Sequence, residues 1–227
     1  MVDLHAHVVP FIDDGSVSLD DSLEMLKVAQ SQGVTDMVLT PHLNRVYELP
    51  VVKVKQAFEQ FKNQAKNSGC DMNLYLGQEI FVDSSFNKFF SRDDILTINN
   101  TDFALVEFDF QEEFDIAETV YQMKRQGLKA IIAHFERYSY TDISVANEVK
   151  SLGGYIQVNA ESCTGGIFGK SKIKKLFSQN LVDFVASDVH VFRKYKMQKA
   201  KEWIEKRYGE SVANAVLKEN ALKILKG

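Results

Sequence analysis

The feature of this sequence that most restricts its fold is a repeated pair: an apolar segment of strand length, followed at once by a histidine or a carboxylate. The pair recurs along the whole chain and uses all five histidines. The polar residues in these positions are His5, His7, Asp14, His42, Glu79, Glu107, His134, Asp188 and His190. Parallel strands that end at one edge would bring all of them together.

The apolar segments alternate with stretches of helical periodicity. The expected strands are near-continuous apolar runs, as in parallel strands covered on both faces, and they span residues 2–4, 34–40, 72–76, 103–108, 129–133, 155–158 and 182–186. Helices are expected between them, with Ser18 capping the first. Four helices are each followed by a glycine that suits a left-handed helix end: Gly33, Gly69, Gly127 and Gly153.

About seven β/α steps predict an α/β fold, a distorted (β/α)7 TIM-like barrel. The length of 227 residues fits a single domain over residues 1–227. A flat, doubly wound sheet is the alternative. No glycine-rich phosphate loop follows the first strand, which weakens a nucleotide-binding interpretation.

Composition excludes several classes of protein. The formal charge of -4 argues against general nucleic-acid binding. No stretch approaches the roughly 20 apolar residues that a membrane span needs, so no membrane insertion is expected. The first residues lead straight into two candidate ligands and do not resemble a signal peptide. Together with two unpaired cysteines, Cys70 and Cys163, this start predicts a cytoplasmic protein.

Imidazoles and carboxylates without thiolates suit manganese, iron or zinc. Nine candidate ligands exceed the needs of one ion and indicate two or three divalent ions that share carboxylates. Taken singly, each residue has a simpler explanation: a lone histidine often only donates a hydrogen bond, and Asp14 can shape the turn at Asp13-Asp14-Gly15. The joint placement favours a multinuclear site, which would attract a phosphate dianion and make water more acidic.

Other polar residues are candidate substrate contacts. Arg137 follows His134 by three residues and could hold phosphate oxygens in bidentate fashion. Arg45 and Arg193 lie three residues after His42 and His190, and Asn159 ends the sixth expected strand. For each arginine, a solvated surface charge is the competing explanation.

The motifs around these residues resemble those of the polymerase and histidinol phosphatase (PHP) family. They are Asp3-Leu4-His5-Ala6-His7, Asp13-Asp14-Gly15, Thr40-Pro41-His42, Gly77-Gln78-Glu79-Ile80, Val106-Glu107-Phe108, Ala133-His134-Phe135-Glu136-Arg137-Tyr138 and Ala186-Ser187-Asp188-Val189-His190. Within that family, the chain is most similar to the manganese-dependent bacterial protein-tyrosine phosphatases of capsule and exopolysaccharide loci. The loops after His42 and His190 depart from the pattern.

This resemblance implies a PHP-type barrel with a trinuclear centre, manganese being the preferred metal. His5, His7, Glu79 and Asp188 would hold one ion, Glu79, Glu107 and His134 a second, and Asp14, His42 and His190 the third. Arg137, Asp188 and His190 would be catalytic, and a metal-activated hydroxide would attack phosphotyrosine. The implied partner is the phosphotyrosine-bearing tail of a bacterial tyrosine kinase that controls capsular polysaccharide synthesis; the resemblance leaves the oligomeric state open.

Several rival functions remain at this point. A phosphatase of the same family acting on histidinol phosphate or another small molecule would share every ligand. An amidohydrolase is less consistent with the extra Asp14 and Glu79, and an exonuclease with the acidic balance. A non-enzymatic phosphopeptide-binding module is the least favoured. A cysteine-dependent tyrosine phosphatase is excluded, because no arginine stands six residues after Cys70 or Cys163.

Overall fold

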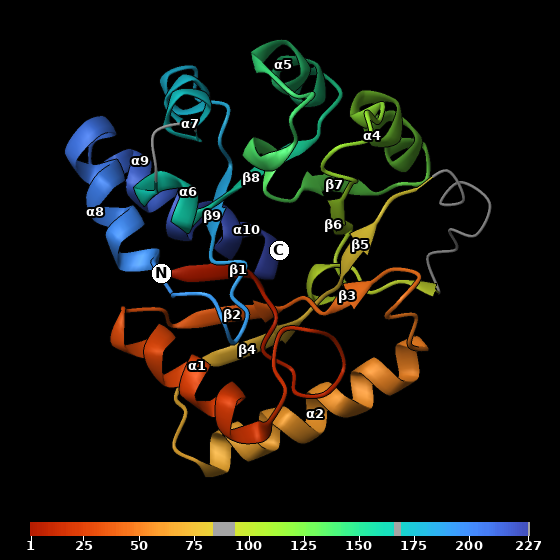
Figure 1. Ribbon diagram of the computed structural model, residues 1–227, viewed down its shortest axis with the longest axis vertical. Coiled ribbons are helices and arrows are strands. Elements are labelled where there is room, and N and C mark those ends of the chain that lie inside the picture. The colour runs from red at the N-terminus through yellow and green to blue at the C-terminus, as the bar shows by residue number, and fades with distance from the viewer. Residues whose placement is uncertain (84–93, 166–168, 227) are drawn as a thin grey trace.

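The strands form a curled parallel sheet with helices around it (Figure 1), in a computed structural model that describes residues 1–83, 94–165 and 169–226. All strand pairings in these residues are parallel. The strands are β1 (Val2–Ala6), β2 (Asp36–Leu39), β3 (His42–Leu43), β4 (Asn73–Leu76), β5 (Glu79–Phe81), β6 (Phe103–Glu107), β7 (Lys129–Ile132), β8 (Tyr155–Asn159) and β9 (Phe184–Ala186). The predicted α/β fold with a curled, barrel-like sheet is confirmed.

The strands follow one another around the curl in chain order, except that β2 pairs with β4 and β3 with β5. β1, β2 and β4 form one part, and β3, β5, β6, β7, β8 and β9 form the other. The two parts are continuous along the chain, because β3 resumes β2 after Pro41 and β5 resumes β4 after Gly77 and Gln78. The first and last strands meet through a parallel bridge between Ala6 and Val189. The short strands β3 and β5 were not expected from the sequence.

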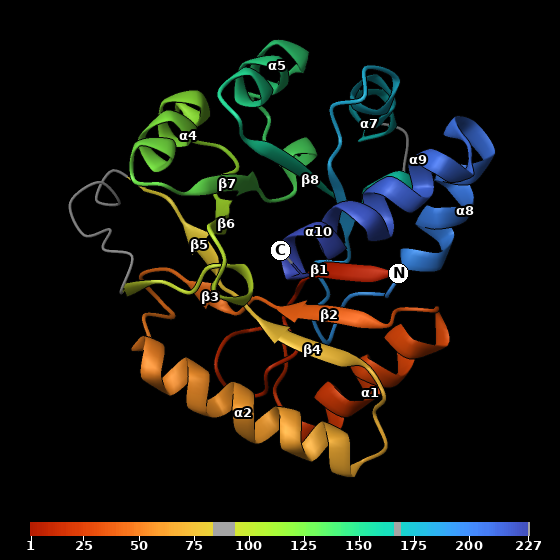
Figure 2. The same ribbon diagram turned by 180° about the vertical axis from the view of Figure 1, so that it is seen from behind.

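Most of the helices lie around the outside of the strands (Figure 2). They are α1 (Leu19–Ser31), α2 (Val51–Asn67), α4 (Ile116–Arg125), α5 (Ile143–Ser151), α6 (Ala160–Thr164), α7 (Gly169–Ser178), α8 (Met197–Tyr208), α9 (Glu210–Asn214) and α10 (Asn220–Lys226). Short helical turns are η2 (Ile98–Asn100), η3 (Phe135–Arg137) and the π-helical η4 (Ala215–Glu219). Ser18 caps α1 as predicted, since its side chain accepts a hydrogen bond from the backbone of Asp21. The four glycines after α1, α2, α4 and α5 have positive φ.

Two apolar clusters stabilise this arrangement. The larger one lies between the strands and the surrounding helices. In the smaller one, strand residues such as Leu4 and Leu105 pack with Ile224 and Leu225 of α10. α10 therefore covers the middle of the curled sheet on the face seen in Figure 2. The loops that follow the strands lie on the opposite face.

No helix in the described ranges is long and apolar enough to cross a membrane. The cysteines Cys70 and Cys163 are free.

Candidate metal centre

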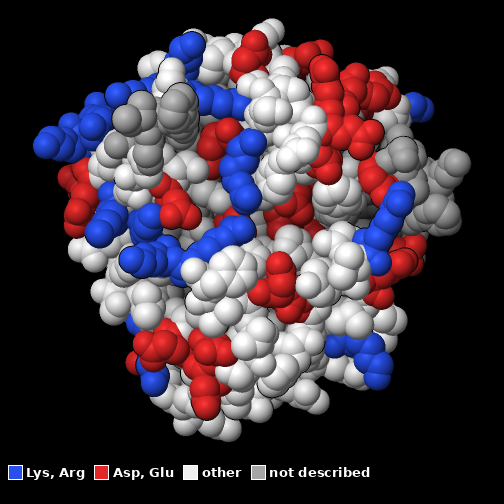
Figure 3. Space-filling view, viewed as in Figure 1, with Lys and Arg blue, Asp and Glu red and all other residues white. Residues whose placement is uncertain are grey.

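The nine candidate ligands converge at the carboxyl ends of the strands. His5 lies near the end of β1 and His7 directly after it, and Glu107 is the last residue of β6. His42 and Glu79 are the first residues of β3 and β5, just beyond the carboxyl ends of β2 and β4. His134 comes after β7, Asp188 and His190 come after β9, and Asp14 lies in the loop between β1 and α1. Figure 3 shows a hollow on this face, with acidic side chains at its floor and lysine or arginine side chains along its left side. The structure thus brings together all the residues that the sequence pattern singled out.

Glu79 is at the middle of the cluster, and four imidazoles surround its carboxylate. Its Oε2 lies 3.2 Å from Nε2 of His5, 3.1 Å from Nε2 of His7 and 3.1 Å from Nδ1 of His42. Its Oε1 lies 2.9 Å from Nε2 of His134. One carboxylate therefore faces ligand atoms from separate strand ends, which is the position of a bridging ligand.

The environment of Glu79 fits a cation better than a hydrogen-bond donor. The side chain is 1% exposed, and within the described ranges its Oε2 has no hydrogen-bond partner despite three nearby ring nitrogens. The Nε2 atoms of His5 and His7 also approach to 3.0 Å. Buried polar atoms without partners cost free energy. Ions held between these nitrogens and oxygens would satisfy both groups.

The candidate ligands form three overlapping groups. Within each group, every residue offers one ligand atom that lies within 4.8 Å of those of the other members. The groups are His5, His7, Glu79 and Asp188; His42, Glu79 and Glu107; and His7, His42 and His190. His134 also approaches the second group, with its Nε2 3.4 Å from Oε1 of Glu107. Asp14 approaches the third, with its Oδ1 3.5 Å from His42 and 3.7 Å from His190. These donor sets suit divalent manganese, iron or zinc.

Two of the candidate ligands have an unusual backbone conformation. His134 has φ 32° and Asp188 has φ 49°, both in the left-handed region that non-glycine residues rarely adopt. Such strain persists only where surrounding structure imposes it, and it concentrates at functional sites. Asp188 is held there by a hydrogen bond from its backbone N–H to the carbonyl of His5.

Gln157 orients two of the histidines, and the sequence interpretation did not single it out. Its Oε1 accepts from the backbone N–H of His134 and lies 3.2 Å from Nδ1 of His5. The side chain is fully buried on β8. A polar residue inside an apolar strand is the signal that could have identified it, because burying an amide requires hydrogen-bond partners. Groups of this kind set the ring orientation and tautomer of metal ligands.

Asp13 has the same kind of role in the loop after β1. Its Oδ2 lies 2.9 Å from Nδ1 of His7 and accepts from the backbone N–H of His42. Its Oδ1 accepts from the backbone N–H of Gly15. The turn-shaping role considered for Asp14 therefore belongs to Asp13, while Asp14 faces the imidazoles.

The ionisable groups of the centre perturb one another strongly. Burial lowers the pKa of His134, but hydrogen bonds to Glu107 and Glu79 outweigh it and raise that pKa to about 10. Burial and the nearby charge of His7 lower the pKa of His190 to about 4. Since metal ligands must be deprotonated, ions and protons would compete for these atoms.

Arg137 and Arg193 both reach Asp188 from the edge of the cluster. Their NH1 atoms lie 3.1 Å and 2.5 Å from its Oδ2. Both arginine side chains are about one-third exposed. Asn159 donates to the same Oδ2 and is 5% exposed, so it holds Asp188 and is poorly placed to meet a substrate.

Arg45 is more remote from the cluster. Its side chain is 75% exposed, and its NH2 lies 2.7 Å from Oδ2 of Asp83. The structure therefore holds Arg45 at the surface, paired with Asp83, and does not bring it together with the nine candidate ligands.

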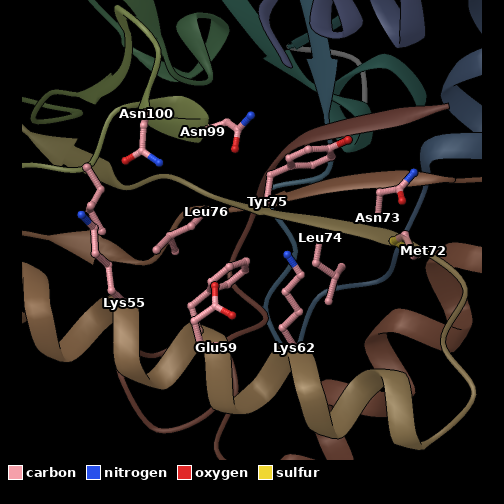
Figure 4. A pocket seen from close by; sticks show the side chains of 12 residues that line it. Lys55, Glu59, Lys62, Met72, Asn73, Leu74, Tyr75, Leu76, Asn99 and Asn100 are labelled. Carbon is pink, nitrogen blue, oxygen red and sulfur yellow. The ribbon is translucent and has the colours of Figure 1, made fainter. Parts of the chain in front are cut away.

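One pocket lies away from this centre. It has a volume of about 580 Å³ and lies between α2 and β4, with Lys55, Glu59 and Lys62 facing Tyr75 and Leu76 (Figure 4). None of the nine candidate ligands lines it.

A curled parallel sheet with a cluster of histidines and carboxylates at the carboxyl ends of its strands defines the class: a barrel-type, metal-dependent hydrolase. The chain belongs to the family described as capsular polysaccharide synthesis, CpsB/CapC, whose sequence profile matches residues 1–226.

Individual relatives cover most or all of the chain. CapC of Staphylococcus aureus is 34% identical over 84% of this chain and 77% of its own length. The tyrosine-protein phosphatase YwqE of Bacillus subtilis is 31% identical over 100% of this chain and 92% of its own. A crystal structure from work on YwqE and on CpsB of Streptococcus pneumoniae, described as unique metal-dependent tyrosine phosphatases, superposes with a TM-score of 0.92. It is 29% identical and covers 100% of this chain and 94% of that one.

Proposed function

We propose that this chain is a metal-dependent protein-tyrosine phosphatase, built as one metallophosphatase domain over residues 1–227. The observation that supports this most strongly is the buried Glu79 carboxylate, which faces four imidazoles from three different strand ends. Relatives that are named tyrosine-protein phosphatases match the chain over its full length. The phosphatase interpretation of the sequence is thereby supported.

The proposed ligands are the nine residues of the cluster, binding two or three ions, with manganese the first choice. Divalent ions there would supply positive charge for a phosphate dianion and would lower the pKa of water, so that a hydrolytic nucleophile is available near neutral pH. Within this set, Asp188 and His190 are also the proposed catalytic residues. Gln157 and Asp13 fix the orientation of His5 and His7.

The arginines bind and orient the phosphate group in this proposal. Arg137 and Arg193 are neutralised in part by Asp188, and each keeps further N–H donors for phosphate oxygens. The Arg137 guanidinium also stacks on Phe110, 4.3 Å from the ring centroid, which restricts its orientation. Arg45 contacts the protein that carries the phosphotyrosine. We propose that this protein is a tyrosine kinase of capsular polysaccharide synthesis, because the chain belongs to a capsule synthesis family.

The test combines metal analysis with turnover of three substrates. Protein loaded with manganese, iron or zinc is assayed on a phosphotyrosyl peptide, the matching phosphoseryl peptide and histidinol phosphate. We expect two or three ions per chain and the highest kcat/KM on the phosphotyrosyl peptide, with manganese the most effective metal. Faster turnover of histidinol phosphate would leave the metal centre intact as a hypothesis and would overturn the substrate assignment.

A further inference from the structure

Large exposed apolar side chains lie mainly on three loops that follow strands bearing candidate metal ligands. Among the described residues eight such side chains are exposed, and two of them, Val52 and Tyr121, lie on helices α2 and α4. The other six lie on the loops that follow β1, β3 and β9, and we call them the apolar rim: Phe11, Val17, Val46, Leu49, Val191 and Phe192. Scattered apolar residues need no explanation, but a concentration at one opening indicates a binding surface.

Hydrogen bonds join these three loops at their bases. The backbone N–H of Val191 donates to the carbonyl of Gly15 over 2.7 Å, which ties the loop after β9 to the loop after β1. The backbone N–H of His42 donates to Asp13, which ties the start of the short strand β3, two residues before its loop, to the loop after β1. The apolar rim is therefore held around Asp14, whose carboxylate faces His42 and His190.

Two aromatic rings of these loops stand directly beside candidate ligands. The ring of Phe192 is 5.5 Å from that of His190, and the ring of Tyr47 is 6.1 Å from that of His42 and nearly parallel to it. The His42 and His190 rings are 6.0 Å apart, so the two aromatic rings flank the same ligand pair. Phe192 is 69% exposed, so most of its side chain faces solvent.

Phe11 is held outward by the backbone of its loop. It has φ 68° and is 73% exposed, and its N–H donates to the carbonyl of Ser16. A phenylalanine in the left-handed region with its ring in solvent gains nothing for the fold from that ring. The loop thus presents an aromatic side chain at the opening, two residues before Asp13.

We propose that the apolar rim binds the phenyl ring of phosphotyrosine, with Phe192 and Tyr47 flanking the ring and Phe11 packing against its outer edge. This inference rests on the proposed function and names the part of the substrate that is selected. With its phosphate at the ligand cluster, a phosphotyrosyl side chain carries its ring at the level of the rim. Phosphoserine has no ring to offer, so aromatic contacts there favour phosphotyrosine.

The test compares two peptides of the same sequence, one with phosphotyrosine and one with phosphoserine. Phe192→Ala and Phe11→Ala are each expected to lower kcat/KM on the phosphotyrosyl peptide about tenfold, mainly through KM, and to leave the phosphoseryl peptide unchanged. Phe192→Tyr should restore the selectivity, because it keeps the ring. Tyr121→Ala, an exposed aromatic on α4, is the matched control and should behave as wild type. Metal content is measured for every variant, and Phe11→Ala is decisive if Phe192→Ala loses metal.

Equal losses on both peptides, or no loss on either, would overturn the role of the apolar rim while the phosphatase assignment stands. The role would also be overturned if Phe11→Ala dissociated a dimer or removed binding to lipid vesicles with peptide turnover unchanged. Wild-type protein that cleaves neither peptide but hydrolyses histidinol phosphate would overturn the proposed function itself.

Discussion

Individual side chains at the candidate centre are placed at considerable energetic cost. Glu79, His5 and His7 are at most 1% exposed, and burying ionisable groups is unfavourable unless they are paired or bind metal. Asp188 and His134 add backbone strain. This cost falls on residues whose side chains face one another. We therefore expect substitutions of the ligands to lose metal, and substitutions of neighbouring residues to keep it.

His42→Ala and Asp188→Ala should lower both metal content and turnover, because each removes a ligand atom from a group within 4.8 Å. Arg137→Ala should keep the metals and lose about 10²–10³ in kcat, since a guanidinium remains protonated and stabilises charge without ligating. Elemental analysis beside steady-state kinetics on a phosphotyrosyl peptide measures both quantities. Metal loss in Arg137→Ala would contradict this division of roles.

Lys172 on α7 provides a pH dependence outside the metal ligands. Burial lowers its pKa to about 8, although the charges of Glu136 and Asp142 oppose that shift. Its ammonium donates to the carbonyl of Tyr138. Between about pH 8 and the ordinary lysine value of 10.5, the unfolded chain holds a proton that the folded chain has lost. Raising the pH through this window therefore favours the folded state.

The free energy of unfolding of wild-type protein should accordingly rise between pH 8 and 10.5 relative to that of Lys172→Met. Urea denaturation at several pH values measures the difference. Lys174→Met, an exposed lysine of the same helix, serves as the control and should follow the wild-type profile. Parallel profiles for wild type and Lys172→Met would refute the assignment.

At the scale of secondary-structure elements, close packing fixes the position of the loop that follows a strand. The loop between β1 and α1 packs so closely on β1 that a Cβ on Gly15 would lie 2.2 Å from Cβ of His7. At the far end of α1, Gly33 has φ 83° with nothing within 4 Å of an added Cβ. One glycine is required by close contact and the other by backbone conformation alone.

Gly15→Ala should therefore weaken metal binding about 10–100-fold, because the loop that carries Asp13 and Asp14 must move away from His7. Gly33→Ala should cost about 1 kcal/mol of unfolding free energy and leave metal affinity unchanged, since only helix-end strain is added. Metal titration and urea denaturation of both variants separate the two effects. Equal metal affinity in both variants would show that the loop adjusts without disturbing His7.

At the scale of the whole molecule, the candidate ligands come from strands spread from β1 to β9, and unfolding would separate them. Ligands that bind only the folded state stabilise it by mass action, about 3 kcal/mol when the free metal is 100 times Kd. For a chain of this length, chelation should lower Tm by about 5–10 °C. Calorimetry before and after chelation measures the shift, and manganese should restore it. Chelation should lower the Tm of Asp188→Ala much less than that of the wild type. An equal shift in Tm would mean that the stabilising ions bind elsewhere.

Much of the element pattern could be predicted because it is local. Apolar runs of strand length, the Ser18 cap and the glycines after four helices are read from neighbouring residues, and the structure confirms them. The short strands β3 and β5 were missed, because their residues form strands only through pairing with each other and with β6. The role of Asp13 was also hidden, since its partners His7 and His42 come from two different strand ends.

The sequence by itself determined which residue types are available for the centre and that each follows a strand. A parallel sheet brings its strand ends to one edge, so the order of residues along the chain was enough to name the set of nine. Only the tertiary structure decided that Glu79 faces four imidazoles and that Gln157 and Asp13 orient two of them. It also decided that Asp188 accepts hydrogen bonds from two arginines and from Asn159. Those relations depend on side-chain directions and on the curl that joins Ala6 to Val189, which no local pattern encodes.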